Sequence, residues 1–245
     1  MLNINADMEF VEDRKQCSYF DNKLSDTRYK IQHDCNANDA YRLLERGWRR
    51  FGKMSFVPEC VDCNECMSIR IDVKNYKFSK SDKRVLAKNK DTDVYVQEPS
   101  LSLEHIDLYN RYHKHMEAKK QWKSSDISPE DYHASYVDGA KDYGKEILYI
   151  RNDKLIAVAL SDFFSTGISS IYCYYDHDYK DLSLGRYSIL AQISIAKNHN
   201  IPYIYLGYWI KDHFSMGYKE AYEPFEYLIN RPTQEDAPIW RMYGR

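Results

Sequence analysis

The alternation of hydrophobic and polar positions is clearest in the second half of the chain. The stretch EILYIRNDKLIAVALSDFF, residues 146–164, holds two apolar runs around the polar pair Asn152-Asp153, which predicts two strands joined by a turn. A third strand is predicted in GISSIYCYYD, a buried helix in LGRYSILAQISIAKNH and a last strand in IPYIYLGYWI, at residues 167–176, 184–199 and 201–210. This order, with short connections, predicts a mixed α/β sheet layered with helices.

The first half of the chain predicts shorter elements. DAYRLLER, 39–46, reads as a short helix that Gly47 terminates. WRRFGKMSFVPEC, 48–60, favours a strand pair, and ECMSIRIDV, 65–73, alternates like a strand with its apolar side chains on one face. The remaining segments are a basic strand end that enters a helix at 76–91, a helix with apolar positions at helical spacing at 102–116, and a polar, loop-rich stretch at 117–145. Because Pro99 interrupts the chain, we expect an N-terminal region over 1–98 and a second domain over 99–245.

Composition narrows the classes of protein that fit. Of the 245 residues, 43% are hydrophobic, and the formal net charge is -2, so RNA would have to bind a local basic patch rather than a global field. No run approaches the ~20 apolar residues of a membrane span, and the N-terminus has no signal pattern. We therefore expect no membrane partner and a cytoplasmic protein, whose six cysteines are free, catalytic or metal-bound rather than disulfide-linked.

Two stretches resemble a ligand site of an α/β sheet. In YYDHDYKDLSLGRYSILAQ, 174–192, a strand runs through a short loop into a helix that Gly185 opens, and a helix N-terminus seats phosphate or a developing oxyanion. N-acetyltransferases hold the pyrophosphate of coenzyme A this way, usually with two glycines, so close packing is an equal alternative here. In GYWIKDHFSMGYKEAYEPFEYL, 207–228, Tyr208 lies at the end of a strand and Lys219 follows it, and both are candidate catalytic residues. An aromatic core layer is the alternative, although it explains Lys219 less easily.

A basic segment mixes cations with aromatic rings. Arg46, Arg49 and Arg50 surround Trp48, and nucleic-acid sites favour this combination. These arginines are the candidate RNA-binding residues, and the alternative is a solvated face.

Four cysteines could converge on one site. Cys60, Cys63 and Cys66 form a C-x-x-C-x-x-C run, and Cys17 would complete four thiolates suited to zinc or an iron–sulfur cluster. One run of three is a weaker signature than two separated pairs, so a structural role beside the substrate site is the favoured interpretation. His113 and His115 do not share a helix face, which argues against a histidine metal site.

Several motifs together resemble the arginyl-tRNA–protein transferase family, in particular its bacterial branch. They are CSYF, LLERGWRRFGKMSFVPECVDCNECMSIRI, SKSDKRVLAKN, LGRYSILAQI, YLGYWI and MGYKEAYEPFE, which occur in this order over nearly the whole chain. The resemblance implies a GNAT-like (N-acetyltransferase-like) fold in the C-terminal part. It also implies transfer of leucine from leucyl-tRNA to the α-amine of proteins that begin with Asp or Glu, which marks them for proteolysis, with no required cofactor. The turn at 21–26, Cys35 and the C-terminal tail depart from the family pattern.

The implied reaction sets what the site residues must do. An α-amine has a pKa of about 7.7–8.0, so positioning and oxyanion stabilisation matter more than a strong base. Asp162 and Asp176 follow strand ends beside the proposed cradle and are candidates to handle the amine proton, unless they are caps. Arg70 and Arg84 are candidates to bind the acceptor carboxylate, although Arg70 could be solvated. The remaining substrate-binding candidates lie around the cradle: Tyr174, Ser183, Gly185 and Tyr187.

Three other functions remain open at this point. One is transfer of arginine, because the donor side chain is not readable from the residues. The second is acyl-CoA-dependent N-acylation, and the third is a non-catalytic cysteine-cluster sensor that binds RNA through its arginines.

Overall fold

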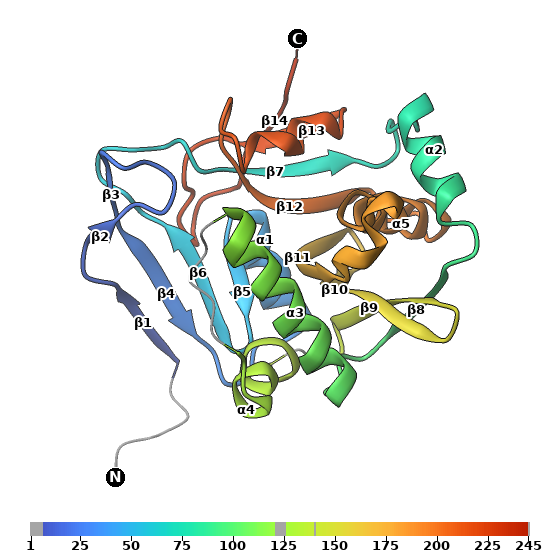
Figure 1. Ribbon diagram of the computed structural model, residues 1–245. Coiled ribbons are helices and arrows are strands. Elements are labelled where there is room, and N and C mark those ends of the chain that lie inside the picture. The colour runs from blue at the N-terminus through green and yellow to red at the C-terminus, as the bar shows by residue number, and fades with distance from the viewer. Residues whose placement is uncertain (1–6, 121–125, 140, 245) are drawn as a thin grey trace.

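An eight-stranded sheet forms the centre of the computed structural model, which describes residues 7–120, 126–139 and 141–244. The strand order is β14-β13-β7-β12-β11-β10-β9-β8. These strands are β7 (Met67–Asp72), β8 (Asp93–Gln97), β9 (Gly144–Arg151), β10 (Lys154–Phe164), β11 (Gly167–Tyr175), β12 (Tyr203–Trp209), β13 (Phe225–Leu228) and β14 (Trp240–Met242). Helices cover both faces, so the predicted mixed α/β fold is confirmed (Figure 1).

The two faces of the large sheet carry different helices. On one face, α5 (Leu184–Asn198) and α2 (Lys80–Lys88) pack with apolar side chains of β7, β10 and β12. On the other face, α3 (Leu103–Lys120), α4 (Pro129–Tyr132) and a π-helical turn, η1 (His133–Val137), bury tyrosines against β10 and β11. Two 3-10 turns complete the helices, η2 (His177–Leu182) and η3 (Gly217–Ala221). Much of the tyrosine content therefore lies in the core rather than at an open surface.

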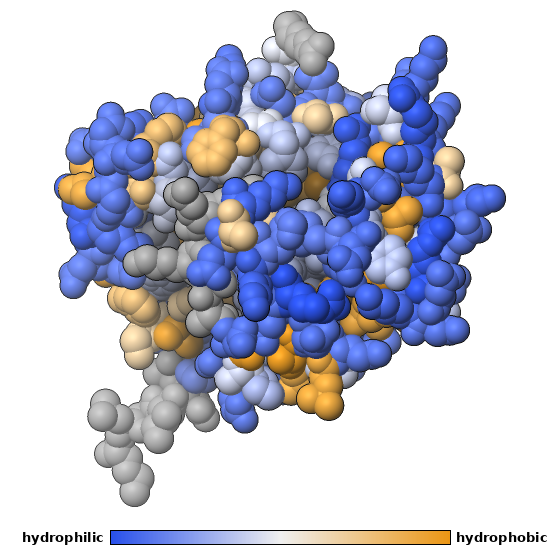
Figure 2. Space-filling model, in the orientation of Figure 1, coloured by the Kyte–Doolittle hydropathy of each residue, from blue (hydrophilic) through white to orange (hydrophobic). Residues whose placement is uncertain are grey.

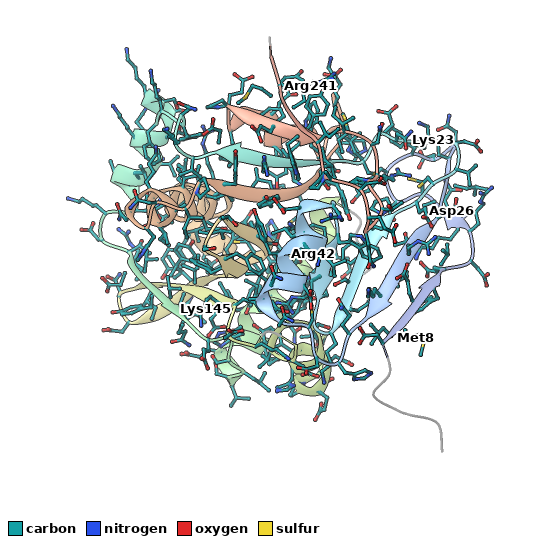
Figure 3. The ribbon with its side chains drawn as sticks, turned by 180° about the vertical axis from the view of Figure 1, so that it is seen from behind. Met8, Lys23, Asp26, Arg42, Lys145 and Arg241 are labelled. Carbon is teal, nitrogen blue, oxygen red and sulfur yellow. The ribbon has the colours of Figure 1, made fainter. Side chains whose placement is uncertain are left out.

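A second, four-stranded sheet lies beside the large one. Its order is β1 (Met8–Val11), β4 (Thr27–Ile31), β6 (Met54–Pro58), β5 (Arg49–Phe51), and a short pair, β2 (Lys15–Gln16) and β3 (Leu24–Ser25), adjoins it. Helix α1 (Ala37–Glu45) begins at the cap residue Asn36 and is followed by Gly47, whose φ of 86° suits glycine. Figure 3 shows α1, marked by Arg42, in front of the large sheet and beside the small one. The predicted helix at 39–46 and strand pair at 48–60 are confirmed.

The parallel strands β11 and β12 separate, and this positions the site. They pair only from Gly167 with Tyr203 to Ser169 with Tyr205. Helix α5 connects them, while β11 stays paired with β10 and β12 stays paired with β7. A splayed parallel pair joined by a helix is the arrangement of a GNAT-like fold, which agrees with the expectation.

Some boundaries differ from the sequence-based expectations. Residues 76–79 form no strand before α2, which begins with a capping box of Ser79 and Asp82. The expected boundary near residue 98 falls in the loop between β8 and α3, yet β7 and β8 belong to the same sheet as the strands that follow it. The stretch at 117–145, expected to be loop-rich, contains the end of α3, α4 and η1, while 121–125 and 140 lie outside the described residues.

The surface seen in Figure 2 is predominantly hydrophilic, with small, separate orange patches on its described part. Within the described ranges, no helix is long and apolar enough to cross a membrane.

Candidate functional site

Arg49 lies in the opening between β11 and β12. The hairpin of β5 and β6 directs its side chain into the large sheet, where Nη2 donates to the carbonyl oxygen of Ser170 and Nη1 to that of Tyr205, 3.5 Å away. These carbonyls belong to β11 and β12, at the point where the two strands stop pairing with each other. Gly207 makes this approach feasible, since a Cβ there would lie 3.2 Å from Nε of Arg49. Burial lowers the pKa of Arg49.

Lys219 occupies the far end of the same opening. Its Nζ donates to the carbonyl oxygen of Tyr208, 2.5 Å away, and the side chain is buried. Burial, and then the nearby charge of Arg49, lower the pKa of Lys219 to about 7. The hydroxyl of Tyr208 points to the carbonyl oxygens of Gly47 and Phe56, 2.9 and 3.2 Å away, and so ties β12 to the small sheet. The structure thus brings together the predicted pair Tyr208 and Lys219.

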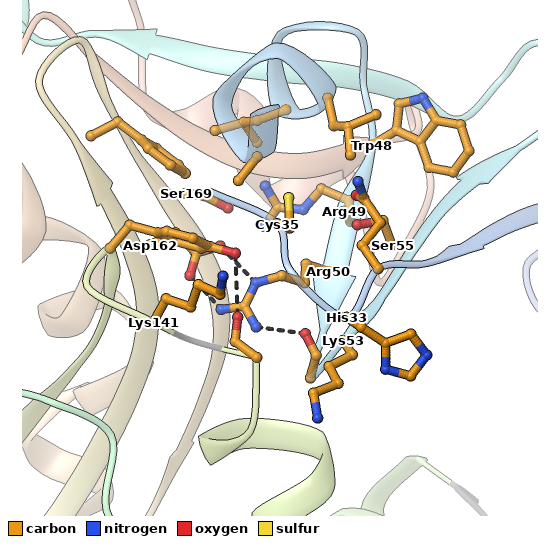
Figure 4. A pocket seen from close by; sticks show the side chains of 18 residues that line it. His33, Cys35, Trp48, Arg49, Arg50, Lys53, Ser55, Lys141, Asp162 and Ser169 are labelled. Atoms are coloured by element: carbon orange, nitrogen blue, oxygen red, sulfur yellow. Dashed lines mark hydrogen bonds and ion pairs between the residues drawn. The ribbon is translucent and has the colours of Figure 1, made fainter. Parts of the chain in front are cut away.

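A cavity of about 30 Å³ lies between α1, β5 and β10, with Arg49, Arg50 and Asp162 among its lining residues (Figure 4). Arg50 holds Asp162 in a bidentate ion pair, with Nη2–Oδ1 and Nε–Oδ2 distances of 2.5 and 3.1 Å. Asp162 is only 4% exposed, so the pair is buried. The carboxylate keeps lone pairs free for a further donor, which an α-amine would supply.

A larger cavity of about 230 Å³ has Tyr208 in its wall. Its wall combines apolar and polar side chains: Val57, Pro58, Met67, Leu228 and Ile229 on the one hand, and Arg46, Asn64, Ser68, Asn230 and Arg231 on the other. Cys66 also lines it, which places one cysteine of the C-x-x-C-x-x-C run beside the site.

Asp176 is distant from Asp162. Strands β10 and β11 are antiparallel, and Asp162 pairs with Ser169 near the start of β11, whereas Asp176 follows the end of that strand. The expectation that both aspartates sit beside one cradle is therefore wrong. Asp176 caps η2 and forms ion pairs with Lys154 and Arg111 at 2.8 and 3.0 Å. Despite burial, these contacts hold its pKa below the usual range.

Arg70 is neither solvated nor free. Its Nε and Nη2 both lie 2.6 Å from Oε2 of Glu226, and Nη1 donates to the hydroxyl of Tyr205. The guanidinium also stacks on the rings of Tyr203 and Trp240, with its central carbon 3.7 and 4.4 Å from their centroids. Arg70 is absent from the lining of both cavities, so recognition of a carboxylate would require Glu226 to leave.

The other predicted basic residues are also scattered. Arg84 is exposed on α2, which packs on the opposite face of the sheet from α1. Arg46 donates to the backbone carbonyls of Thr233 and Asp236 and so anchors the C-terminal segment. Because the guanidinium groups of Arg49 and Arg50 are buried on protein oxygens, neither presents itself to an RNA backbone.

Of the residues predicted to form the cradle, Ser183 and Gly185 lie at the start of α5, whereas Tyr174 and Tyr187 are buried in the core. Ser183 has a φ of 54° and makes no side-chain cap, so it leaves the N–H groups at the start of the helix without a side-chain partner. Gly185 packs closely under Tyr175, since a Cβ would lie 3.2 Å from the ring of Tyr175. Tyr174 is buried against Tyr132 on the α3 face, and Tyr187 packs on Tyr149 in the core under α5.

The four cysteines of the predicted cluster lie near one another. Burial, and then the charges of Cys17, Cys60 and Cys63, raise the pKa of Cys66 to about 12. Nζ of Lys23 lies 3.4 Å from Sγ of Cys63. Four thiols have the donor chemistry of a zinc or iron–sulfur site, but no three Cys, His, Asp or Glu side chains among the described residues are arranged to hold a metal ion.

Sequence reasoning missed most of the cavity between α1 and β10. Cys35, Lys53, Lys141, Tyr143 and Ser169 line it and come from separate segments of the chain. The sequence held one signal, the adjacent Arg49-Arg50 pair, and both of these side chains line the cavity.

The parallel strands β11 and β12, splayed and joined by α5, define a GNAT-like fold. Two family models match this chain: "Arginine-tRNA-protein transferase, N terminus" over residues 15–84 and "Arginine-tRNA-protein transferase, C terminus" over 104–229. The chain belongs to this family. It is therefore an aminoacyltransferase whose substrates are an aminoacyl-tRNA and a protein.

Relatives named aspartate/glutamate leucyltransferase match nearly end to end. The protein from Helicobacter hepaticus is 45% identical over 237 residues, covering 97% of this chain and 98% of its own. One from Campylobacter jejuni subsp. jejuni serotype O:6 is 47% identical over 226 residues, covering 92% and 95%. One from Hahella chejuensis is 32% identical over 232 residues, covering 94% and 97%.

Solved structures are more distantly similar. FemX aligns with a TM-score of 0.48 at 10% identity, over 81% of this chain and 68% of its own. L-PGS from Bacillus licheniformis aligns with a TM-score of 0.46 at 13% identity, over 86% and 66%.

Proposed function

We propose that this enzyme transfers leucine from leucyl-tRNA to the α-amine of proteins that begin with aspartate or glutamate. The product would carry an N-terminus that directs the protein to proteolysis, and we place the reaction in the cytoplasm, where charged tRNA is found. The observation that carries the proposal is the 45% identity, over nearly the full length of both chains, to a relative named for this activity.

The transfer is an aminolysis of an ester. The neutral α-amine of the acceptor attacks the carbonyl carbon of the leucyl ester, a C–N bond forms, and the C–O bond to the terminal ribose breaks. The amine loses a proton, and the ribose oxygen gains one. Because the amine is partly neutral at pH 7, we propose that the enzyme acts mainly by alignment and by electrostatic stabilisation.

Residues around the splayed strands support these two tasks. We assign Asp162, in the small cavity, to orient the attacking amine, because its oxygens can accept beyond their bonds to Arg50. Lys219 and Arg49 place positive charge between β11 and β12, where charge on the ester oxygen would develop. In this assignment Asp176 has a structural role, because it lies at the opposite end of the β10–β11 pair from Asp162.

The apolar cavity beside Tyr208 fits the leucyl side chain. Its volume of about 230 Å³ exceeds what a leucine needs, and Val57, Met67 and Leu228 offer apolar contact. A pocket of this kind separates leucine from arginine by charge, but it separates similar apolar side chains by only about 1–3 kcal/mol.

We propose that the chemistry requires no metal. The cysteine cluster lies beside this apolar cavity through Cys66, and a structural role there agrees with the hydrogen bonds that its thiols make.

The test is transfer of radiolabel from charged tRNA to peptides. Leucyl-tRNA and arginyl-tRNA are supplied in parallel, with peptides that begin with Asp, Glu, Lys or Ala. Label moving from leucyl-tRNA to the Asp and Glu peptides alone supports the proposal. Transfer of arginine would show that the donor is arginyl-tRNA. Transfer of label from acetyl-CoA instead would show that the function is N-acylation.

A further inference from the structure

Phe214 is the most exposed large hydrophobic side chain among the described residues, with an exposed fraction of 89%. It lies in the connection between β12 and η3, directly after two exposed polar residues, Lys211 and Asp212, and the partly buried His213. A single exposed ring is common on protein surfaces, so its support and its position decide what it can bind.

The ring of Phe214 rests on a firmly held support. Its centroid lies 4.7 Å from that of the His213 ring. Nε2 of His213 is 3.1 Å from the carbonyl oxygen of Tyr19, and Nδ1 accepts from the backbone N–H of Ser215, 3.3 Å away. The rings of Tyr19 and Phe20 meet His213 at steep angles, each with its centroid 5.7 Å away. Phe214 therefore presents an aromatic ring to solvent on a support that is hydrogen-bonded on two sides.

The connection that carries Phe214 joins the two parts of the proposed site. Tyr19, which holds His213, is a neighbour of Cys66, since burial and then the charge of that thiol raise the pKa of Tyr19. Cys66 lines the cavity assigned to the leucyl side chain. Further along the same part of the chain, Lys219 donates to the carbonyl oxygen of Tyr208 at the end of β12, where the proposed function places the ester oxygen.

The covalent structure of the donor brings bases to this place. In an aminoacyl-tRNA the amino acid is esterified to the terminal ribose of an unpaired 3′ end, so the last nucleotides must lie next to the reacting ester. Unpaired bases stack on aromatic side chains whatever their sequence, because every base has a π-face. A protein partner would instead need a wider apolar surface than one ring that follows polar residues.

We infer that Phe214 stacks on a base of the unpaired 3′ end of the tRNA. This inference rests on the proposed function only in its use of an aminoacyl-tRNA as donor. It assigns donor binding to the connection after β12 and not to Arg46, Arg49 and Arg50, whose guanidinium groups are engaged with protein oxygens.

Phe214→Trp converts the ring into a reporter that still stacks. Its fluorescence should be quenched when the full-length enzyme is saturated with uncharged tRNA, because a stacked base quenches indole emission. The same tRNA without its unpaired 3′ nucleotides should leave that emission unchanged. The wild type, titrated in parallel, gives the signal of the chain's own four tryptophans for subtraction. Equal quenching by the two RNAs, or no quenching by intact tRNA, would overturn the inference.

Phe214→Ala adds a kinetic readout. We expect KM for leucyl-tRNA to rise about fivefold or more, which corresponds to roughly 1 kcal/mol, the low end for stacking of one base. KM for the acceptor peptide should not change, and Phe214→Tyr should restore the wild-type values. Because the side chain is exposed, its removal leaves the core intact.

Tyr95→Ala is the matched control. Tyr95 is another exposed aromatic residue, at 52%, and it lies on the edge strand β8. This variant should keep both KM values. An unchanged KM for leucyl-tRNA in Phe214→Ala, or an equal rise in both variants, would contradict the inference. A rise confined to the peptide KM would show that Phe214 binds the acceptor protein instead.

The outcomes separate this site from the proposed function. Leucine transfer by the wild type, with kinetics that Phe214→Ala leaves unchanged, would keep the function and remove this site. Quenching that depends on the 3′ end, in an enzyme that transfers arginine and not leucine, would support the site and contradict the proposed donor.

Discussion

Lys219 hydrogen-bonds the carbonyl oxygen of Tyr208 at the end of β12 where that strand has no neighbour on the β11 side. Arg49 does the same for the carbonyls of Ser170 and Tyr205, at the point where the two strands begin to separate. Two basic side chains therefore satisfy backbone acceptors that a continuous sheet would pair with another strand. Arg49 and Lys219 thus stabilise the separation of β11 and β12, and their side chains place positive charge between the two strands.

The charge of Lys219 should appear in the pH dependence of stability. The folded protein releases this proton near pH 7, whereas an unfolded chain holds it until about pH 10.4. Between these values the unfolded state binds more protons, so the free energy of unfolding contributed by this group rises with pH. Urea unfolding at pH 7 and pH 9 should show this rise in the wild type and lose it in Lys219→Met. Parallel pH dependence of the two proteins would refute the low pKa.

Asp162 should matter for both stability and transfer. In Asp162→Asn, Arg50 remains buried without its counter-charge, which typically costs about 3–5 kcal/mol. We expect a lower free energy of unfolding and, where the variant folds, a reduced kcat for leucine transfer. Circular dichroism melts and single-turnover assays measure these separately. A stable variant with a normal kcat would show that Asp162 takes no part in the reaction.

Asp176 provides the contrast, because its role is structural. Its pKa is held below that of an unfolded aspartate, about 3.9, so its ion pairs stabilise the protein above that pH and are lost as the pH falls through the lower folded value. Asp176→Asn should be less stable than the wild type at pH 7, with the gap closing as the pH falls below about 3.9 and through the lower folded pKa. Transfer kinetics of the folded variant should match the wild type, and a selective loss of kcat would show that the chemistry uses this edge of the sheet.

The elements were largely predictable because each depends on local signals. Asn152 and Asp153 both adopt positive φ, at 50° and 59°, as a two-residue hairpin turn requires, and their polarity between two apolar runs indicated this. Gly47 likewise follows α1 with the positive φ that its position predicted.

The site was harder to predict because it depends on strand direction and pairing. Asp162 and Asp176 look equivalent in the sequence, and only the antiparallel register of β10 and β11 places them at opposite edges. Arg70 alternates like a solvent-facing residue, yet β13 and β14 extend the sheet beside it and supply Glu226 and Trp240. Residues from distant segments meet at such points, and no local pattern reports them.

The proposed leucyl pocket predicts a steric effect. Val57→Trp would fill much of the cavity beside Tyr208, so KM for leucyl-tRNA should rise several-fold, while KM for the acceptor peptide should change little. Steady-state kinetics with each substrate varied in turn measure the two constants. A rise confined to the peptide KM would place the acceptor, not leucine, in this cavity.

Removal of metal should leave transfer intact. We expect that treatment with EDTA and o-phenanthroline does not change the rate, and that Cys60→Ser loses stability before it loses kcat. Metal analysis of anaerobically purified protein accompanies the assay. Inactivation by chelators, with recovery on adding zinc or on anaerobic reconstitution of an iron–sulfur cluster, would show that the four thiols hold a required metal.

The most direct test of the central claim is a competition experiment. The enzyme receives a full set of charged tRNAs and an equimolar mixture of peptides that differ only in the first residue, among them Asp, Glu, Asn, Gln, Lys and Ala, and mass spectrometry identifies each product. The account predicts that only the Asp and Glu peptides gain a residue and that this residue is leucine. Addition of arginine, or leucylation of the Asn and Gln peptides at a rate equal to their acidic counterparts, would contradict it.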